Sequence, residues 1–337
     1  MIGVGVVGFG YWGPNLVRNF SEAEATRVMA VCDRRAESLA TVNRRYPSIR
    51  TTPNFKDLLD DSSIDAIAVA TPVRSHFELA LAALECGKHV LVEKPMTETT
   101  DQARRLIAAA QRRNRVLMVD HTFVYTPAIR KIHDLVAANE LGKIYYYDSI
   151  RVNLGLFQHD VNVIWDLAVH DFSILEYVLG EHPVAVSANG ASPVQQSPES
   201  IAYISLFFAE GTIAHINVNW LAPVKIRQIL VGGSHKMIVY DDLEPSEKIK
   251  VYDKGVTITD DPEKIYQLRI GYRAGDMSAP QLGNREGLAV EVEHFVDCIT
   301  TGCAPQTDGV AGMRVVELLE AASRSLKQRG RPIELKE

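Results

Sequence analysis

Apolar and polar positions follow two different patterns along the chain, and the change comes near residue 121. In the first part, short apolar runs alternate with stretches that place apolar residues at helical spacing. Buried strands that alternate with helices of ten to fifteen residues are typical of a parallel, doubly wound sheet. The predicted strands and helices in this part are Ile2–Val7, Val28–Cys32, Asp65–Ala70, Ser75–Leu84, His89–Val92, Thr99–Arg113 and Val116–Val119.

After residue 121, long runs of strand-forming residues dominate, and short turns at Ala209–Gly211 and Gly232–Ser234 indicate antiparallel connections. The stretch 243–284 has little periodicity, and we expect it to be an excursion with some strand content. The predicted strands are Ile144–Val152, Val184–Ala188, Ile201–Phe208, Thr212–Trp220, Lys225–Val231 and Lys236–Tyr240, and the helices are Pro127–Ala138, Ile164–Leu179, Glu286–Thr300 and Val310–Lys327. The sequence therefore predicts an α/β chain with a doubly wound domain at 1–121 and an α+β domain with a large, mainly antiparallel sheet at 122–337.

A glycine-rich loop follows the first predicted strand and opens a helix. Its residues are Gly8, Phe9, Gly10, Tyr11, Trp12 and Gly13, and Asp33 stands twenty positions further on, at the end of the second strand. Strand, glycine loop, helix, strand and acid form the order of a dinucleotide-binding Rossmann unit. The glycines allow a tight turn and close approach of a pyrophosphate, and a helix N-terminus attracts phosphates. The alternative is a glycine turn between packed elements.

Asp33 favours NAD, because its carboxylate would accept hydrogen bonds from the adenosine ribose and repel a 2′-phosphate. Arg34 directly after it could stack on adenine or pair with a 2′-phosphate. Because of Asp33, NADP is the less favoured cofactor, although Arg34 keeps it open.

Composition narrows the class of protein. The 337 residues suffice for two domains, and a net charge of −6 argues against nucleic acid or an anionic membrane as partner. No apolar run approaches the roughly 20 residues of a spanning helix, and the N-terminus does not resemble a signal peptide, so we expect a cytoplasmic protein. The four cysteines form no CxxC pair, and Cys32, Cys86 and Cys298 are expected to be buried thiols.

Lys94 is a candidate catalytic residue because it stands where a parallel strand ends, at the edge where open sheets bind ligands. Its ammonium group could stabilise developing oxyanion charge or relay a proton, or it could simply cap a turn. Glu93 would be its ion-pair partner or a cofactor contact, and the Lys94–Pro95 bond is a candidate cis peptide.

Asp166 and His170 are four residues apart and would share one face of a helix. A carboxylate one turn from an imidazole could handle a proton and orient a hydroxyl, or it could be an ordinary ion pair on a solvated face. The spacing lacks a distinctive zinc-ligand pattern, and we expect no metal.

Further polar residues near these elements are candidate substrate contacts. Arg151 and Asn153 could hydrogen-bond a polar substrate, while Lys225 and Arg227 share a strand face and could hold a diphosphate. The alternative, which is favoured for Arg151 and Asn153, is a polar residue on a solvated strand end or sheet edge. The full set of substrate candidates is Tyr125, Arg151, Asn153, Asn162, Asp166, Lys225 and Arg227, with His121 and His159 nearby in sequence.

The motifs occur in the order found in the Gfo/Idh/MocA oxidoreductases, which the chain resembles over essentially its whole length. The matching segments are Gly8–Gly13, Thr71-Pro72 with His76, Gly87–Pro95 with its Glu93-Lys94-Pro95 ending, and Asp166-x-x-x-His170. The resemblance implies NAD(P) bound near Thr71, Pro72, His76 and Glu93. It also implies that Lys94 and His170 act at the reacting carbon, that Asp166 orients the substrate, and that the open sheet face forms a homodimer or homotetramer.

Two segments, Arg151–Gly155 and Trp220–Arg227, are similar to the branch of the family that oxidises the C3 hydroxyl of UDP-N-acetylglucosamine or its uronic acid. The expected substrate is therefore a small nucleotide sugar, and the 3-keto product would feed an aminotransferase. The alternatives are a dehydrogenase of a free sugar or inositol and a non-catalytic NAD-responsive regulator. One departure matters: Val124–Pro127 replaces a stretch in which many relatives carry an arginine, so that contact is not transferred.

Overall fold

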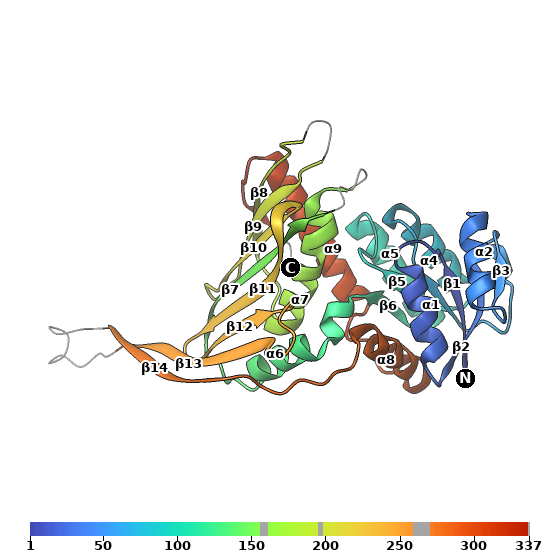
Figure 1. Cartoon of the computed structure of the whole chain (residues 1–337). Helices are drawn as coiled ribbons and strands as arrows, with labels where there is room; N and C mark the ends of the chain where they lie inside the picture. Colours follow the sequence, from blue (N-terminus) through green and yellow to red (C-terminus); the bar gives the residue numbers. More distant parts are fainter. Residues whose placement is uncertain (156–160, 195–197, 259–269, 336–337) are drawn as a thin grey trace. The chain divides into compact units, whose positions relative to one another are not determined.

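The computed structural model describes residues 1–155, 161–194, 198–258 and 270–335 (Figure 1). By their contacts these residues form two compact units: Met1–Thr126 with Arg285–Glu317, and Pro127–Asn284 with Leu318–Glu337. The expected domain division at 121/122 stays a prediction. His159 lies outside the described residues.

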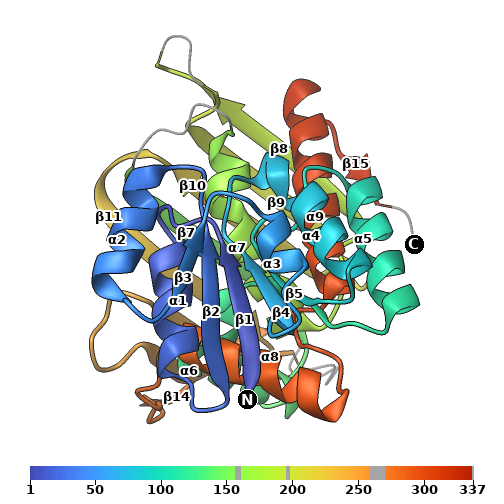
Figure 2. The same cartoon turned by 90° about the vertical axis from the view of Figure 1, so that its right-hand side faces the viewer.

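The first unit contains a parallel six-stranded sheet. Its strands are β1 (Ile2–Val7), β2 (Thr26–Cys32), β3 (Arg50–Thr52), β4 (Ala66–Val69), β5 (His89–Glu93) and β6 (Leu117–Asp120). They lie in the order β3-β2-β1-β4-β5-β6, as Figure 2 shows for β2, β1 and β4. The order reverses between β1 and β4, and in such sheets a dinucleotide binds beyond the carboxyl ends of the strands at this reversal. The predicted doubly wound sheet is confirmed.

Helices cover this sheet. They are α1 (Gly13–Glu22), α2 (Ala36–Arg45), α3 (Lys56–Leu59), α4 (His76–Glu85), α5 (Thr100–Arg113) and α8 (Gly287–Thr301), with 3₁₀ turns at Val73–Ser75 and Thr122–Tyr125. The hydroxyl of Thr99 accepts a hydrogen bond from the Gln102 N–H and so caps α5. The rings of Phe20 and Phe295 lie 6.4 Å apart and join α1 to α8. A segment from late in the sequence therefore completes the first unit.

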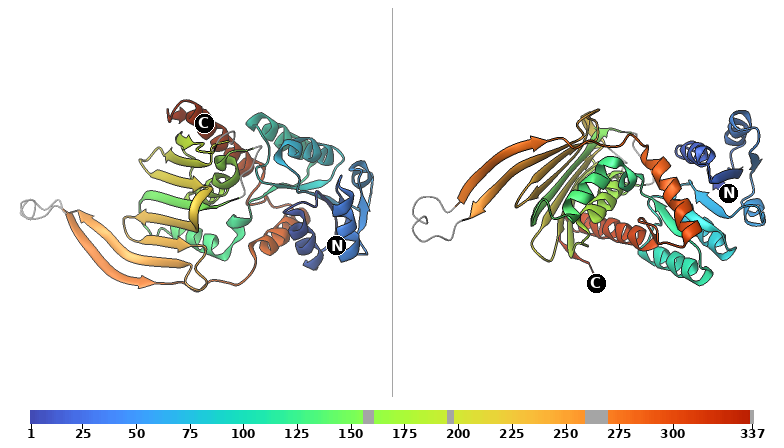
Figure 3. Two further views of the ribbon diagram at one scale, coloured as in Figure 1. Left: turned by 45° about the horizontal axis from the view of Figure 1, so that its top comes forward. Right: turned by 90° about the horizontal axis from the view of Figure 1, so that it is seen from below.

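The second unit contains a nine-stranded sheet in the order β14-β13-β12-β11-β7-β10-β9-β8-β15 (Figures 1 and 3). Neighbouring strands are antiparallel except for β7 and β10, which are parallel. The predicted large, mainly antiparallel sheet is confirmed. The strands are β7 (Ile144–Leu154), β8 (Ala185–Ala191), β9 (Ile201–Phe207), β10 (Ile213–Asn219), β11 (Leu221–Gly233), β12 (Met237–Asp241), β13 (Ile249–Ile258), β14 (Ile270–Ser278) and β15 (Ile333–Glu334).

Helices α6 (Pro127–Ala137) and α7 (Val169–Leu179) lie on one face of this sheet, and α9 (Gly309–Lys327) ends in the second unit (Figure 3). The opposite face carries exposed apolar side chains of neighbouring strands, among them Tyr203 and Ile213. Among the described residues, no helix combines the length and the apolar character needed to cross a bilayer.

Candidate active site

Each glycine of the loop after β1 meets a different constraint. Gly8 has φ +95°, and a Cβ there would lie 2.4 Å from the Ala70 carbonyl oxygen. A Cβ on Gly13 would lie 2.2 Å from the Gly8 carbonyl oxygen, so glycine is required for α1 to start this close to the loop. A Cβ on Gly10 would have more room: the nearest atom in the described part of the chain is a guanidinium nitrogen of Arg35, at 3.7 Å. The backbone at Gly10 is thus open to a ligand, as a bound pyrophosphate requires.

The aromatic residues of the loop join it to the end of β6. Tyr11 is exposed and its ring stacks on that of Trp12 at 6.5 Å. The Trp12 indole N–H donates to a carboxylate oxygen of Asp120 at 2.8 Å. The loop therefore contacts the opposite half of the same sheet, far from β2.

Asp33 is held by the glycine loop and by Arg35. Its two oxygens accept hydrogen bonds from the backbone N–H groups of Phe9 at 2.7 Å and Arg35 at 2.8 Å. The Arg35 guanidinium adds contacts of 3.3 Å to both oxygens. Burial raises the pKa of Asp33, but the hydrogen bonds outweigh it and leave the pKa below its usual value. Arg35, the residue after Arg34, is therefore the arginine that contacts this carboxylate.

His76 links two segments of the predicted cofactor site. It is buried, and its ring nitrogens lie 2.9 Å from the Pro95 carbonyl oxygen and 2.6 Å from that of Thr71. The Lys94–Pro95 peptide bond, which precedes the first of these carbonyls, is cis as the sequence suggested. Burial lowers the pKa of His76, and the neutral ring carries one N–H for the two carbonyls. His76 thus positions the ends of β4 and β5; direct contact of His76, Thr71 and Pro72 with the cofactor stays a prediction.

Three buried carboxyl groups meet at the ends of β5 and β6. Glu93 and Asp120 are paired residues of these strands, and Glu291 of α8 approaches the same Asp120. The Thr122 hydroxyl has one hydrogen and donates it to Asp120 at 2.5 Å. Glu93 Oε1 and both carboxyl oxygens of Glu291 have no donor among the described residues. Carboxyl oxygens that face each other can hydrogen-bond only if one of them is protonated.

Burial, followed by the charge of Asp120, raises the pKa of both Glu93 and Glu291 well above the usual range. The Lys94 charge acts in the opposite direction on Glu93. His121 is also buried, which lowers its pKa to about 4, and neither of its ring nitrogens has a hydrogen-bond partner in the described part of the chain. This end of the sheet therefore combines a lysine with a neutral imidazole and carboxyl groups that tend to hold protons.

The first unit fits a bound NAD. The open backbone at Gly10 and the N-terminus of α1 suit phosphates, and Asp33 suits a ribose. The unsatisfied buried atoms of Glu93 and His121 are groups that a polar ligand can satisfy.

In the second unit, Asp166 lies in a π-helical turn, Ile164–Ala168, that leads into α7. π-Helical turns occur often at functional sites. The Asn162 side-chain oxygen accepts from the Trp165 N–H at 3.3 Å, and its amide donates to Glu199 at 3.2 Å. The buried Trp220 indole donates to an Asp166 carboxylate oxygen at 3.0 Å. Asp166 is therefore fixed by a side chain between β10 and β11, one helical turn before His170.

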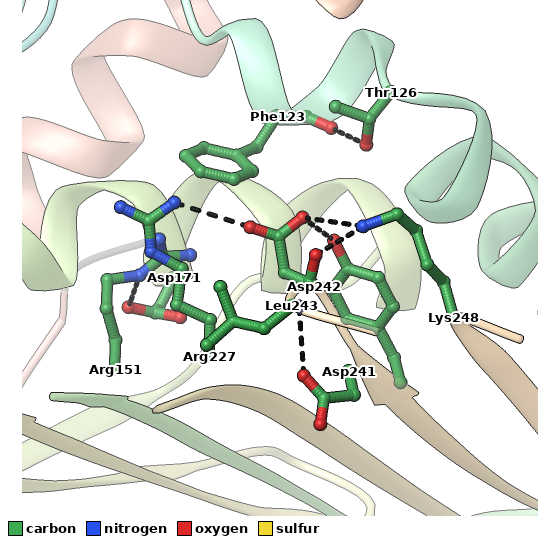
Figure 4. Close-up of polar contacts among 10 residues, drawn as sticks. Phe123, Thr126, Arg151, Asp171, Arg227, Asp241, Asp242, Leu243 and Lys248 are labelled. Carbon is green, nitrogen blue, oxygen red and sulfur yellow. Dashed lines mark hydrogen bonds and ion pairs between the residues drawn. The ribbon is translucent and has the colours of Figure 1, made fainter. Parts of the chain in front are cut away.

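Arg151 and Arg227 are directly opposite each other on β7 and β11, and each has its own aspartate. Buried Arg151 donates to Asp171 at 2.8 Å, and Arg227 donates to Asp242 at 3.3 Å (Figure 4). Lys248 also lies 3.7 Å from Asp242, and the Tyr240 hydroxyl donates to the same carboxylate at 3.0 Å. The aspartates offset the repulsion expected between two cross-strand cations. As substrate contacts, both arginines stay predictions.

The remaining substrate candidates differ in their surroundings. Tyr125 is buried, and its hydroxyl lies 2.9 Å from that of Thr307 in the first unit. Asn153 is half-buried on β7, whereas Lys225 is exposed and precedes the regular pairing of β11 with β7. Their contacts with substrate also stay predictions.

The fold and the glycine loop define a class, the NAD-binding oxidoreductases, and comparison with protein families agrees. Residues 2–121 match the model of the Gfo/Idh/MocA "Oxidoreductase family, NAD-binding Rossmann fold", and residues 133–335 match that of its "C-terminal alpha/beta domain". The chain belongs to the Gfo/Idh/MocA family. It is an NAD(P)-dependent oxidoreductase, and NAD is its cofactor.

Relatives include dehydrogenases of a UDP-sugar and of inositols. UDP-N-acetylglucosamine 3-dehydrogenase of Acidithiobacillus ferrooxidans is 29% identical over 317 residues, 93% of each chain. A solved structure of that organism's enzyme, 26% identical, has a TM-score of 0.80 and covers 97% of this chain and 99% of its own. GenD2 from gentamicin A biosynthesis, solved with NAD, is 25% identical, with a TM-score of 0.84 and coverage of 100% and 97%. The NAD-dependent scyllo-inositol 2-dehydrogenase of Bacillus subtilis is 23% identical, with coverage of 99% and 95%.

Sequence reasoning missed three features of these sites. Glu291 interrupts the apolar positions Leu288, Val292 and Phe295 of α8, and an acid within such a stripe was the available signal. The Trp220–Asp166 contact joins residues 54 positions apart and had no local signal. Arg35 was overlooked in favour of its neighbour Arg34.

Proposed function

We propose that the chain oxidises the C3 hydroxyl of UDP-N-acetylglucosamine, or of its uronic acid, with NAD. Similarity to a UDP-N-acetylglucosamine 3-dehydrogenase over 93% of the chain supports the substrate. The observation that carries the reaction type is the fixed position of Asp166. Its bond to the buried Trp220 holds a carboxylate one turn from His170, as a hydroxyl-orienting pair needs.

Bound NAD supplies the hydride acceptor. Loss of hydride from a secondary alcohol also requires removal of the hydroxyl proton. We assign that proton to His170, the polarisation of the same oxygen to Lys94, and the orientation of a neighbouring hydroxyl or of the imidazole to Asp166. The reverse assignment of Lys94 and His170 is the alternative.

Recognition of the diphosphate is proposed for Lys225 and Arg227. Arg227 shares its charge with Asp242, whereas the exposed Lys225 can turn toward an anion. A diphosphate would therefore compete with Asp242 for the Arg227 guanidinium, which its planar fork of donors allows.

The test is a substrate panel. Purified protein is incubated with NAD⁺ and UDP-N-acetylglucosamine, its uronic acid, UDP-glucose, glucose or inositols, and the near-ultraviolet absorbance of reduced nicotinamide is followed. 2-Oxoglutarate is added in parallel as a recycling acceptor, because reduced cofactor can stay bound. The proposal expects reduction with the acetylated UDP-sugars. Reduction with inositol or glucose alone overturns the substrate, and no reduction with the whole panel overturns the function.

A histidine pair separates the assigned base from a general effect of removing an imidazole. His170→Ala should abolish most turnover and leave NAD⁺ binding intact. His235→Ala is the matched control, since His235 is exposed in the turn between β11 and β12 and lies outside the groups assigned to the reaction. Equal turnover in the two variants contradicts the role of His170.

Oxidation of a free sugar or inositol is the second candidate. Similarity to an inositol dehydrogenase over 99% of the chain favours it, and so does the Asp242 carboxylate on Arg227. Under this alternative, Arg227→Ala leaves the KM for the substrate unchanged. Under the leading proposal, the KM for the UDP-sugar rises.

The proposal includes the assembly and the context of the enzyme. We propose a homodimer or homotetramer formed through the open face of the nine-stranded sheet, where Tyr203 and Ile213 are exposed. Light scattering on wild type and Ile213→Asp tests it, because a charge in an apolar interface should dissociate the assembly. The 3-keto product is proposed to pass to an aminotransferase in the cytoplasm.

A further inference from the structure

Two cysteine sulfurs lie close together at the end of α8, outside the groups assigned to the reaction. Cys298 is a buried residue of the last helical turn, and Cys303 is exposed two residues beyond the helix. Their Sγ atoms are 3.4 Å apart. Between them, Gly302 ends the helix with φ +77°, a conformation that suits glycine and turns the chain back toward Cys298. A disulfide requires about 2.05 Å between the sulfurs, so a small side-chain movement would join them.

We propose that Cys298 and Cys303 form a hydroperoxide-reactive dithiol that closes to an intramolecular disulfide. This site does not depend on the proposed function. It assigns a modification to a pair of residues that the hydride-transfer chemistry leaves unused.

The two thiols suit different steps of the reaction. A hydrogen bond with Thr301, followed by one with Cys298, lowers the pKa of the exposed Cys303 thiol. Burial raises the pKa of Cys298 to about 12. The thiolate is the nucleophile toward peroxides, and exposure is needed to meet them. Cys303 therefore attacks first, and Cys298 is the resolving thiol.

The reaction balances in two steps. The Cys303 thiolate attacks one peroxide oxygen and the O–O bond breaks, which gives a sulfenic acid and a hydroxide or alkoxide ion. This ion takes up the proton that the thiol lost on ionisation and leaves as water or an alcohol. The Cys298 sulfur then attacks the sulfenic sulfur and expels hydroxide, which takes the Cys298 proton and leaves as water. The two thiols lose two electrons, and the hydroperoxide gains them.

The disulfide would fasten the turn that supports the end of β6. The Thr307 hydroxyl donates to the Val119 carbonyl at 2.7 Å, and the Val119 N–H donates to the Thr307 carbonyl at 2.8 Å. The Gln306 N–H also donates to His294 of α8 at 3.0 Å. Closing the ring from Cys298 to Cys303 would restrict the segment that leads to Thr307. Thr307 is hydrogen-bonded to Val119, the residue directly before Asp120.

The other two cysteines provide contrasts. Cys32 is buried, and burial raises its thiol pKa to about 11. Cys86 is exposed at the end of α4, so the expectation that it is buried was wrong. It tests whether exposure alone makes a thiol reactive.

The experiment treats the full-length protein with hydrogen peroxide, blocks remaining thiols with an alkylating reagent, and measures intact mass and linked peptides. The proposal expects free thiols to fall from four to two, a mass lower by about 2 Da before alkylation, a 298–303 link and full reversal by dithiothreitol. Cys303→Ser should lose the link, Cys86→Ser should keep it, and Cys298→Ala should leave a Cys303 sulfenic acid that dimedone labels. Cys303 is exposed, so Cys303→Ser should fold like the wild type, and circular dichroism checks this.

Four thiols after treatment, or a Cys86-linked dimer as the main product, overturns the proposal. Amide hydrogen exchange supplies the second readout. The disulfide should slow exchange of the Gln306 N–H, which donates to His294, and of the Val119 N–H, which donates to the Thr307 carbonyl, and Cys303→Ser should remove this effect. Unchanged exchange in the oxidised protein overturns the link to β6.

Discussion

The six-stranded sheet carries buried carboxylates at both halves of its carboxyl edge, and their surroundings are opposite. Asp33, beyond β2, receives two backbone N–H groups and a guanidinium, and its pKa is lowered. Glu93, at the end of β5, and Glu291, on the covering helix α8, face Asp120 with too few donors, and their pKa values are raised. The first half is built to keep a negative charge, and the second to hold protons.

This difference suggests a division of labour. In dinucleotide-binding sheets of this strand order, the acid after the second strand contacts the adenosine ribose, and the other half receives the second nucleotide. Permanent acceptors give affinity for ribose hydroxyls. Groups with shifted pKa values are found where proton transfer occurs. Lys94 directly follows one such group, Glu93, in the chain. We therefore expect changes at Asp33 to affect cofactor binding and changes near Lys94 to affect turnover.

The largest expected effect is that of Lys94→Ala. Loss of a positioned proton-transfer or polarising group should lower kcat by roughly 10²–10⁴-fold, with NAD⁺ affinity close to that of wild type. Lys56→Ala is the control, since Lys56 is an exposed lysine paired with Asp60. Stopped-flow kinetics and fluorescence titration of NAD⁺ measure the two quantities. If the Kd for NAD⁺ rises by the same factor as kcat falls, the proposed division between a cofactor-binding half and a turnover half is contradicted.

Asp33→Asn should act in the opposite manner. Hydrogen bonds to a charged group contribute about 1.5–3 kcal/mol, so the Kd for NAD⁺ should rise roughly 10–100-fold. At saturating cofactor, kcat should stay near the wild-type value. Isothermal titration and initial rates at high NAD⁺ measure these effects. Unchanged affinity would mean that Asp33 only braces the loop through Phe9.

Glu291→Gln tests, through the free energy of unfolding, whether the carboxyl groups near β5 and β6 hold protons. The folded-state pKa of Glu291 lies above its unfolded value, so the folded protein binds more protons between the two. Its contribution to stability is complete below the unfolded pKa and is lost as the pH rises toward the folded pKa. The amide needs no ionisation, and the variant should be more stable than wild type by about 1–3 kcal/mol near pH 8.

Urea unfolding of wild type, Glu291→Gln and Glu293→Gln across the pH range makes the comparison. Glu293 lies on the same helix, is exposed and pairs with Arg285, so its variant should follow the wild-type curve. A wild-type stability that rises with pH above neutrality, and a Glu291→Gln curve parallel to it, would contradict raised carboxyl pKa values.

The smallest expected effect is that of Arg35→Ala. Arg35 is half-exposed and steadies Asp33 from the solvent side, and such pairs contribute up to about 1 kcal/mol. The Kd for NAD⁺ should rise roughly two- to fivefold. Arg34→Ala, the neighbouring exposed arginine, should show no change in the same titration. The reverse ranking would restore Arg34 as the relevant residue.

Much of the fold could be predicted because apolar periodicity reports burial directly. Strands β1, β2, β4, β5 and β6 end within two residues of their predicted ends, and helix α5 begins one residue late because Thr99 caps it. The hairpin of β13 and β14 was anticipated only as some strand content. Its strands are polar and rich in charge, so alternation is weak there.

The candidate site was less predictable, because its interactions join distant segments. Glycine spacing and strand ends indicated Gly8–Gly13, Asp33 and Lys94 from local sequence alone. The partners of Asp120 and Asp166, which are Glu291 and Trp220, come from other elements and carry no spacing rule. The π-helical turn at Ile164–Ala168 keeps helical periodicity, so the sequence predicted one continuous helix there.

The most direct test of this division, with cofactor binding at Asp33 and turnover at Lys94, is a single-turnover experiment on protein saturated with NAD⁺. Wild type, Asp33→Asn and Lys94→Ala are mixed with the substrate identified by the panel, and the absorbance of reduced nicotinamide is followed after correction for cofactor occupancy. The division predicts that Asp33→Asn reacts at nearly the wild-type rate and that Lys94→Ala is slower by roughly 10²-fold or more. Equal slowing of the two variants at full occupancy would contradict it.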